Sequence, residues 1–248
     1  MNGGIYFPTQ ELAFIGQGRR RICYAVRGTG RCVKFYRKHS ELAPGTKWRI
    51  RLDIMIGRYL WFANINYREW RYHCKLARRL PKDVMAVFPE HVQLVFSKEK
   101  GWGVVETLIR NADGSLSRTV IDEMTLADDP VLARRVYHET ERLFRQLAEY
   151  GVCFFDPRGN VLVQWIAPSV FRLRIADLEP YCRAGIPGLA NIRLYVQCKI
   201  RRRAARYLSR LMTIMAERGL LEAECHTQPH RRDNTVFLRM ARCAGFLW

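Results

Sequence analysis

Short apolar runs separated by glycine-containing turns occupy the first part of the chain. Their lengths, and the turns between them, predict an antiparallel meander of strands. The three predicted strands are residues 12–15, 22–26 and 32–36. Two more strand-like runs, residues 92–96 and 104–108, are joined by a polar turn. The pattern therefore predicts a small antiparallel sheet.

Between these two groups of strands the apolar pattern becomes helical. Through residues 49–60 apolar side chains recur at steps of three and four, which favours a helix. Residues 64–66 interrupt this periodicity, and a second helix is predicted over residues 67–80, where Pro81 ends it. The sequence therefore places a pair of helices between the third and fourth strands.

The second part of the chain begins after the polar, turn-rich segment 110–115, which we take as the boundary between two lobes. A long helix is predicted over residues 131–150, since Asp129 and Pro130 suit its first turn and Gly151 follows its end. The other predicted elements are a hairpin of residues 161–165 and 171–175, and one or two basic helices within residues 192–218. The fold class predicted is α+β.

Composition narrows the class of protein. With 248 residues, 48% of them hydrophobic, the chain can bury a sizeable core. No stretch approaches the roughly 20 apolar residues of a transmembrane helix, and residues 1–10 lack the basic head and apolar core of a signal peptide. The eight cysteines include no Cys-x-x-Cys pair that would indicate zinc or a redox dithiol. We therefore expect a cytoplasmic protein.

The net charge of +19 predicts attraction to polyanions. The candidate partners are an anionic membrane surface, which would make the protein peripheral at the inner membrane face, a phosphorylated glycolipid such as lipopolysaccharide, and nucleic acid. Nucleic acid is the least favoured, because no zinc-finger, RRM or homeodomain signature accompanies the charge. Arginines gather at residues 19–21 and at residues 201–203, 206 and 210. A solvated basic face is the alternative interpretation of these clusters.

Two features of the predicted sheet suit a phosphate site. Gly16 and Gly18 lie between two strands, where glycines let a phosphate approach the backbone N–H groups. Lys34 lies within an apolar strand and points its ammonium to one face of the sheet. Taken singly, each feature also has an ordinary interpretation, a tight hairpin turn and a lysine on an exposed strand face.

Two polar residues flank the predicted hairpin of the second part. Asn160 precedes its first strand and Asp177 follows its second strand. An amide oxygen and a carboxylate at adjacent hairpin ends can share one Mg²⁺ ion, which takes a few oxygen ligands and keeps waters for the rest. The alternative is that both residues simply belong to turns.

The order of these features resembles the protein-kinase-like fold, which uses it to hold ATP. Within that superfamily the chain resembles the PhoP regulatory network protein family, the YrbL-like proteins. The resemblance lies in residues 15–34 (IGQGRRRICYAVRGTGRCVK), 68–80 (REWRYHCKLARRL) and 151–179 (from GVCFFDPRGNVLVQW to IADLE). It therefore covers most of residues 12–180 and little of the last seventy or so residues.

The resemblance implies two lobes with ATP and Mg²⁺ between them. Residues 1–109 would form an N-lobe with a small antiparallel sheet, and residues 110–248 a mostly helical, reduced C-lobe. The implied roles are a phosphate-covering loop (Gly16, Gly18), a phosphate-binding lysine (Lys34), its ion-pair partner (Glu69), a hinge that presents its backbone to adenine (Glu106) and metal ligands (Asn160, Asp177).

The departures from the kinase pattern concern the catalytic loop. The catalytic aspartate of kinases lies five residues before the metal-binding asparagine, where this chain has Phe155, and Asp156 comes one residue later. Leu178-Glu179 stands in place of Phe-Gly, and no Ala-Pro-Glu follows. The leading interpretation is phosphotransfer from ATP to a hydroxyl of a small-molecule or glycolipid acceptor, with Asp156 as the catalytic residue. The alternative is a non-catalytic pseudokinase that acts through its basic surface.

Overall fold

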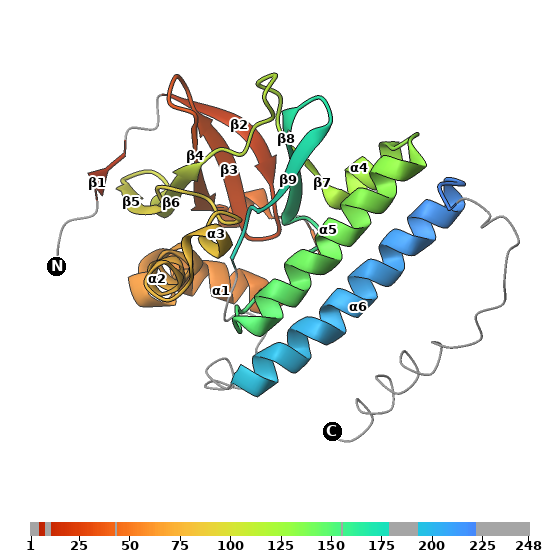
Figure 1. Ribbon diagram of the computed structural model, residues 1–248. Coiled ribbons are helices and arrows are strands. Elements are labelled where there is room, and N and C mark those ends of the chain that lie inside the picture. The colour runs from red at the N-terminus through yellow and green to blue at the C-terminus, as the bar shows by residue number, and fades with distance from the viewer. Residues whose placement is uncertain (1–4, 8–10, 43, 155, 179–192, 222–248) are drawn as a thin grey trace, which may run out of the picture.

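The first part of the protein is built on one antiparallel sheet. A computed structural model describes residues 5–7, 11–42, 44–154, 156–178 and 193–221 (Figure 1). Five strands form the antiparallel sheet in the order β5-β6-β4-β3-β2, and the short β1 adds to β5 in parallel. The strands are β1 (Ile5–Tyr6), β2 (Leu12–Gln17), β3 (Arg21–Val26), β4 (Arg31–Tyr36), β5 (Gln93–Ser97) and β6 (Gly101–Thr107).

The two faces of this sheet have opposite character. Because side chains alternate along a strand and cross-strand partners share a face, one face carries a small apolar cluster centred on Val33, Phe35, Val95 and Val105. On the other face Lys34 pairs in register with Cys23 and Val104. The alternation that predicts these strands therefore also directs Lys34 to a single, polar face.

Helices connect β4 to β5 and cover this polar face (Figure 1). They are η1 (His39–Glu41), α1 (Trp48–Tyr59), η2 (Trp61–Ala63), α2 (Ile65–Ala77) and α3 (Lys82–Met85). Helix α2 begins at Ile65, and the Asn64 side chain caps it by accepting a hydrogen bond from the Asn66 backbone N–H. Asn66, which was predicted to interrupt the helical pattern, therefore lies inside α2. The prediction was wrong at this residue because polar residues that cap a helix give the same sequence pattern as a break between two helices.

The second part combines a three-stranded sheet, β7-β8-β9, with long helices. Its elements are β7 (Arg118–Thr119), α4 (Val120–Leu126), α5 (Pro130–Glu149), β8 (Val161–Ala167), β9 (Val170–Ile175) and α6 (Arg193–Glu217). The predicted start of α5 is confirmed, since the Asp129 side chain accepts a hydrogen bond from Val131 and Pro130 occupies the first turn. Residues 192–218 form one long helix over their described part, α6, rather than two.

The largest apolar core lies between α5, α6 and the hairpin β8–β9, and it extends into the second half of α2. Helices α5 and α6 run side by side (Figure 1), and Phe144 and Tyr207 meet with ring centroids 5.6 Å apart. Tyr72 and Leu76 of α2 are buried in the same core. The structure is thus α+β, as predicted. No helix in the described ranges has the length and apolar character needed to cross a membrane.

Candidate functional site

Five charged side chains meet where the polar face of the sheet approaches α2 and the end of β9. Two are cations, Arg21 and Lys34, and three are carboxylates, Glu69, Glu106 and Asp177. The side chains of the first four are at most 10% exposed, and that of Asp177 is 19% exposed. We call these five residues the ion cluster. Buried charges are costly unless they are paired and hydrogen-bonded, so their arrangement decides what the site can bind.

Lys34 lies at the centre of the ion cluster. Its Nζ is 2.5 Å from Glu106 Oε1 and 4.0 Å from Glu69 Oε1, and it also donates to the backbone carbonyl of Ala176, which is 142 residues away in the chain. Burial opposes the charged form of Lys34, but the carboxylates of Glu106, Glu69 and Asp177 raise its pKa above the ordinary value. Lys34 is therefore charged throughout the physiological range.

Arg21 joins two of the carboxylates. Its guanidinium pairs with Glu69 through Nη1 and with Asp177 through Nη2. Nη1 also lies 3.0 Å from the side-chain oxygen of Asn66, whose amide nitrogen donates to the Trp102 carbonyl at 2.9 Å. Arg21 thus links β3, α2 and the segment after β9, and Asn66 fixes its position.

Glu69 faces Arg21 and Lys34 from the middle of α2. Its Oε1 accepts a hydrogen bond from the backbone N–H of Leu178 at 2.9 Å, so it also holds the segment that contains Asp177. Burial is the largest influence on this carboxyl and raises its pKa to about 8, against the opposing effect of Arg21. Glu69 therefore takes up protons in the folded protein at a pH where an unfolded glutamate is ionised.

This raised pKa predicts a stability that falls with increasing pH. Between its ordinary value near 4.5 and about 8 the folded protein binds more protons at Glu69 than the unfolded chain does, so the free energy of unfolding decreases as pH rises, by up to about 1.4 kcal/mol per pH unit. Chemical denaturation at pH 5.5 and 8.5 measures the effect. Glu69→Gln should flatten the slope, and an unchanged slope would contradict the assignment.

Asp177 and Asn160 stand at the same end of the hairpin β8–β9. Asn160 directly precedes Val161, whose partner in the hairpin is Ile175, and the Asn160 carbonyl accepts from the Ala176 backbone N–H at 2.8 Å. The Asn160 side chain donates to the Asp156 carbonyl at 2.9 Å. Burial opposes ionisation of Asp177, but Arg21 and Lys34 keep its pKa below the ordinary value.

The Asp177 carboxylate is engaged by a cation at the position where it would hold a magnesium ion. The Oδ1 of Asp177 is already bound by Arg21, and a guanidinium there repels a second cation. The hydrogen bond of Asn160 engages its side-chain nitrogen and not the amide oxygen that a metal ion would bind. Within the ranges that the structure describes, no group of three or more His, Cys, Asp and Glu side chains is arranged to hold a metal. A metal at Asp177 Oδ1 would first require its separation from Arg21.

The remaining predicted site residues lie outside the ion cluster. Asp156 is partly exposed, and its Oδ1 lies 3.9 Å from the Arg158 Nε of the same turn. Phe155 lies outside the described residues. Gly16 and Gly18 border the turn between β2 and β3, where the Gly18 N–H donates to the Arg21 carbonyl at 2.8 Å. A Cβ on Gly16 would meet nothing within 4 Å, so space is open beside this backbone.

The sequence did not indicate the contacts that two residues of the site make. In the sequence Arg21 stands where the kinase loop pattern has its third glycine and belongs to a basic run, and the resemblance gives Glu106 a backbone role beside adenine. In the structure the Glu106 side chain is the nearest carboxylate to Lys34. The signal that would have found both is strand register, because Cys32 pairs with Glu106 and Tyr36 with Arg21, so Glu106 and Arg21 share the face of Lys34.

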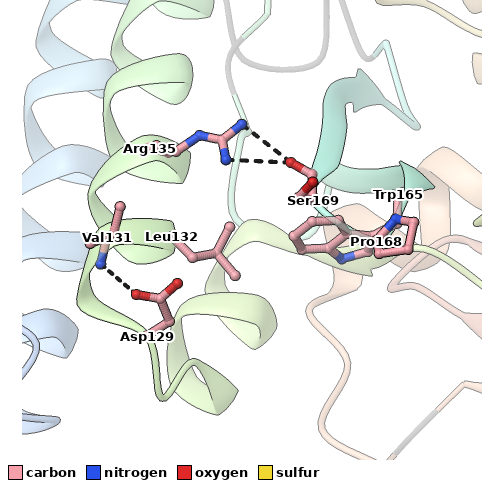
Figure 2. Close-up of a pocket in the computed structure, with 7 residues that line it drawn as sticks. All are labelled: Asp129, Val131, Leu132, Arg135, Trp165, Pro168 and Ser169. Carbon is pink, nitrogen blue, oxygen red and sulfur yellow. Dashed lines mark hydrogen bonds between the residues drawn. The ribbon is translucent and has the colours of Figure 1, made fainter.

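A small hollow elsewhere on the surface carries no comparable chemistry. Its volume is about 120 Å³, and it lies between the start of α5 and the turn of the hairpin β8–β9 (Figure 2). Arg135 there donates to the Ser169 carbonyl at 3.3 and 3.4 Å, and Asp129 caps α5. These polar contacts therefore hold the fold together.

Comparison of the sequence with models of known protein families and with curated proteins gives no match. The functional argument therefore depends on the ion cluster and its surroundings.

Proposed function

We propose that this chain is a kinase-like nucleotide-binding protein whose ion cluster receives the phosphates of ATP. The observation that carries the proposal is the meeting of Lys34, Glu69 and Asp177 at one point. Lys34 comes from β4, Glu69 from α2, which precedes β5, and Asp177 from the segment that follows β9. Protein kinases place the lysine, the glutamate and the acidic residue of their phosphate site on elements in this order.

Within that class we propose membership of the PhoP regulatory network protein family, the YrbL-like proteins. The support is the resemblance of residues 15–34, 68–80 and 151–179. Arg21, Lys34, Glu69 and Asp177 fall inside these three stretches. The stretches that resemble the family thus supply four of the five residues of the ion cluster, and Glu106 lies outside them.

In the enzymatic form of the proposal, Lys34 attracts the phosphates and Asp156 receives the proton of an acceptor hydroxyl. The hydroxyl oxygen forms a bond to the γ-phosphorus as the bond to the bridging oxygen breaks, and ADP leaves. Phosphoryl transfer needs little covalent help, so positioning and charge stabilisation supply most of the rate enhancement. The acceptor class that we propose is a small molecule or glycolipid with a free hydroxyl.

A second candidate, a non-catalytic regulatory protein of the same fold, is favoured by the pair between Arg21 and Asp177. This pair places a fixed positive charge on the carboxylate that a kinase uses for magnesium. Such a protein would bind nucleotide without metal and without turnover. The two candidates differ in whether Asp177 is released when nucleotide binds.

Calorimetric titration of the full chain with ATP, with magnesium and with EDTA, tests the binding proposal. Lys34→Met should weaken ATP binding roughly 10- to 100-fold, because it removes one charged donor to the phosphates. Lys100→Met is the matched control, since Lys100 contacts Tyr24 through its hydroxyl and ring and lies outside the ion cluster. Equal affinities in the two variants would contradict the site, and ATP binding that is unchanged by EDTA would favour the non-catalytic candidate.

A further inference from the structure

Helix α1 exposes apolar side chains on the side that faces away from the sheet. Trp48, Leu52, Met55 and Ile56 recur at steps of four, three and one along the helix, which places them on one side of it. Leu60 and Phe62 extend the surface past its end. All six side chains are between 37% and 66% exposed. We call these six residues the α1 surface.

The opposite side of α1 accounts for its packing. Ile54 is buried with Tyr36 and Leu42, and a Cβ on Gly57 would lie 2.8 Å from the Tyr36 hydroxyl. The helix thus approaches the sheet closely through this side. Packing within the described part of the chain therefore does not account for the apolar character of the α1 surface, and a concentrated exposed apolar patch is typical of an interaction site.

The charged side chains around the α1 surface are mostly basic. Lys47 and Arg49 are exposed beside it, and the Arg49 guanidinium lies 5.6 Å from the centre of the Trp48 ring. Asp53 is the one acidic residue within residues 47–62 of the sequence, and its carboxylate is paired with Arg20 at 2.7 Å. The surface therefore presents apolar and basic groups together.

We propose that the α1 surface docks on an anionic lipid bilayer, with α1 lying in the plane of the interface. Helices that do so combine Trp, Phe and Leu on one side with Lys and Arg at the flanks. The long basic side chains reach the lipid phosphates while the apolar ones enter the acyl boundary. The net charge of +19 adds attraction over a longer range. This inference does not depend on nucleotide binding.

The bilayer proposal also places the candidate site relative to the membrane. Arg20, which holds Asp53 of α1, belongs to the turn between β2 and β3 that contains Gly18. The ion cluster begins at the next residue, Arg21. A bilayer on the α1 surface would therefore lie beside the turn that borders the site.

Co-sedimentation of the full chain with vesicles tests the proposal. Vesicles with about a third phosphatidylserine are compared with pure phosphatidylcholine at several salt concentrations. Leu52→Glu with Met55→Glu should reduce binding to the anionic vesicles at least about tenfold, because both substitutions put a negative charge into the docking surface. Val131→Glu with Leu194→Glu is the matched control, since these side chains are exposed on α5 and α6.

The basic flanks are tested separately. Lys47→Gln with Arg49→Gln should lower the partition onto anionic vesicles about fivefold for each charge removed, and it should weaken the salt dependence. Arg201→Gln with Arg202→Gln, on exposed positions of α6, is the control. Unchanged vesicle binding of the Leu52/Met55 variant would overturn the proposal. The proposal would also be overturned if the wild-type protein binds no vesicles but forms a dimer that the Leu52/Met55 variant dissociates. The surface would then join two copies of the chain.

Discussion

Arg21→Met is expected to lower the free energy of unfolding by roughly 3–5 kcal/mol, the usual cost of removing one partner from a buried ion pair. Arg21 is buried and pairs with both Glu69 and Asp177, so the substitution leaves the Asp177 carboxylate, and the ionised fraction of Glu69, without their nearest cation. Urea denaturation at pH 7.5 measures the loss. Partial recovery is expected when Asp177→Asn is added, because one of the uncompensated charges is then removed.

The neighbouring arginine provides the control. Arg20 pairs with Asp53 at 2.7 Å, but both side chains are partly exposed, and such pairs contribute at most about 1 kcal/mol. Arg20→Met should therefore cost much less than Arg21→Met. Equal losses from the two adjacent substitutions would mean that the ion cluster does not hold the structure together.

The Arg21 variant also separates the two candidate functions. Without the guanidinium, Asp177 is free to bind a cation. If the wild-type protein is non-catalytic, its ATP binding does not depend on magnesium, and the Arg21→Met variant should gain that dependence. A phosphotransferase would show that dependence already in the wild-type chain, because Asp177 must then leave Arg21 during the reaction. Titrations with magnesium and with EDTA distinguish the two.

Asp156→Asn is the second change with a large expected effect. If the protein transfers phosphate, the substitution should reduce turnover by roughly 10²- to 10⁴-fold, which is the usual contribution of a positioned general base. The affinity for ATP should hardly change, because Asp156 lies outside the ion cluster. Release of ADP in the presence of a set of hydroxyl acceptors is the measurement.

Arg158→Gln is the matched control for this substitution. It removes the guanidinium that lies 3.9 Å from the Asp156 carboxylate but keeps the carboxylate itself. Turnover should fall far less than with Asp156→Asn. Turnover by the wild-type protein that Asp156→Asn leaves unchanged would exclude Asp156 as a base. Absence of turnover in the wild-type protein would leave the non-catalytic candidate.

Local pattern was sufficient to predict the larger elements of the fold. The meander of β2, β3 and β4, the hairpin β8–β9 and helix α5 all have a periodicity or a capping residue that the sequence displays. The short elements β1, α3, β7 and α4 were not predicted. Two or four residues of strand or helix have little stability of their own, and α4 depends on burial of Val120 and Met124 in the large core.

The candidate site was predictable where single residues had a clear place in the order of elements, as for Lys34 and Asp177. Arg21 was not, because Arg19, Arg20 and Arg21 are equivalent in the sequence. Only the strand register separates the one that faces Lys34 from its two more exposed neighbours. The pairing of Glu106 with Lys34 also depends on two strands lying side by side, which a linear pattern does not reveal.

Helix α2 belongs to the first part of the molecule, but its second half is buried in the core of the second part. Glu69 lies in its middle, whereas Tyr72 and Leu76 are buried in the large core with α5 and α6. The Tyr72 hydroxyl also accepts a hydrogen bond from the Cys153 backbone N–H at 2.6 Å. An outward movement of α2 would expose these side chains to water and would lose the stabilisation that their burial provides. Glu69 is therefore held in position by a helix whose second half is anchored in the large core.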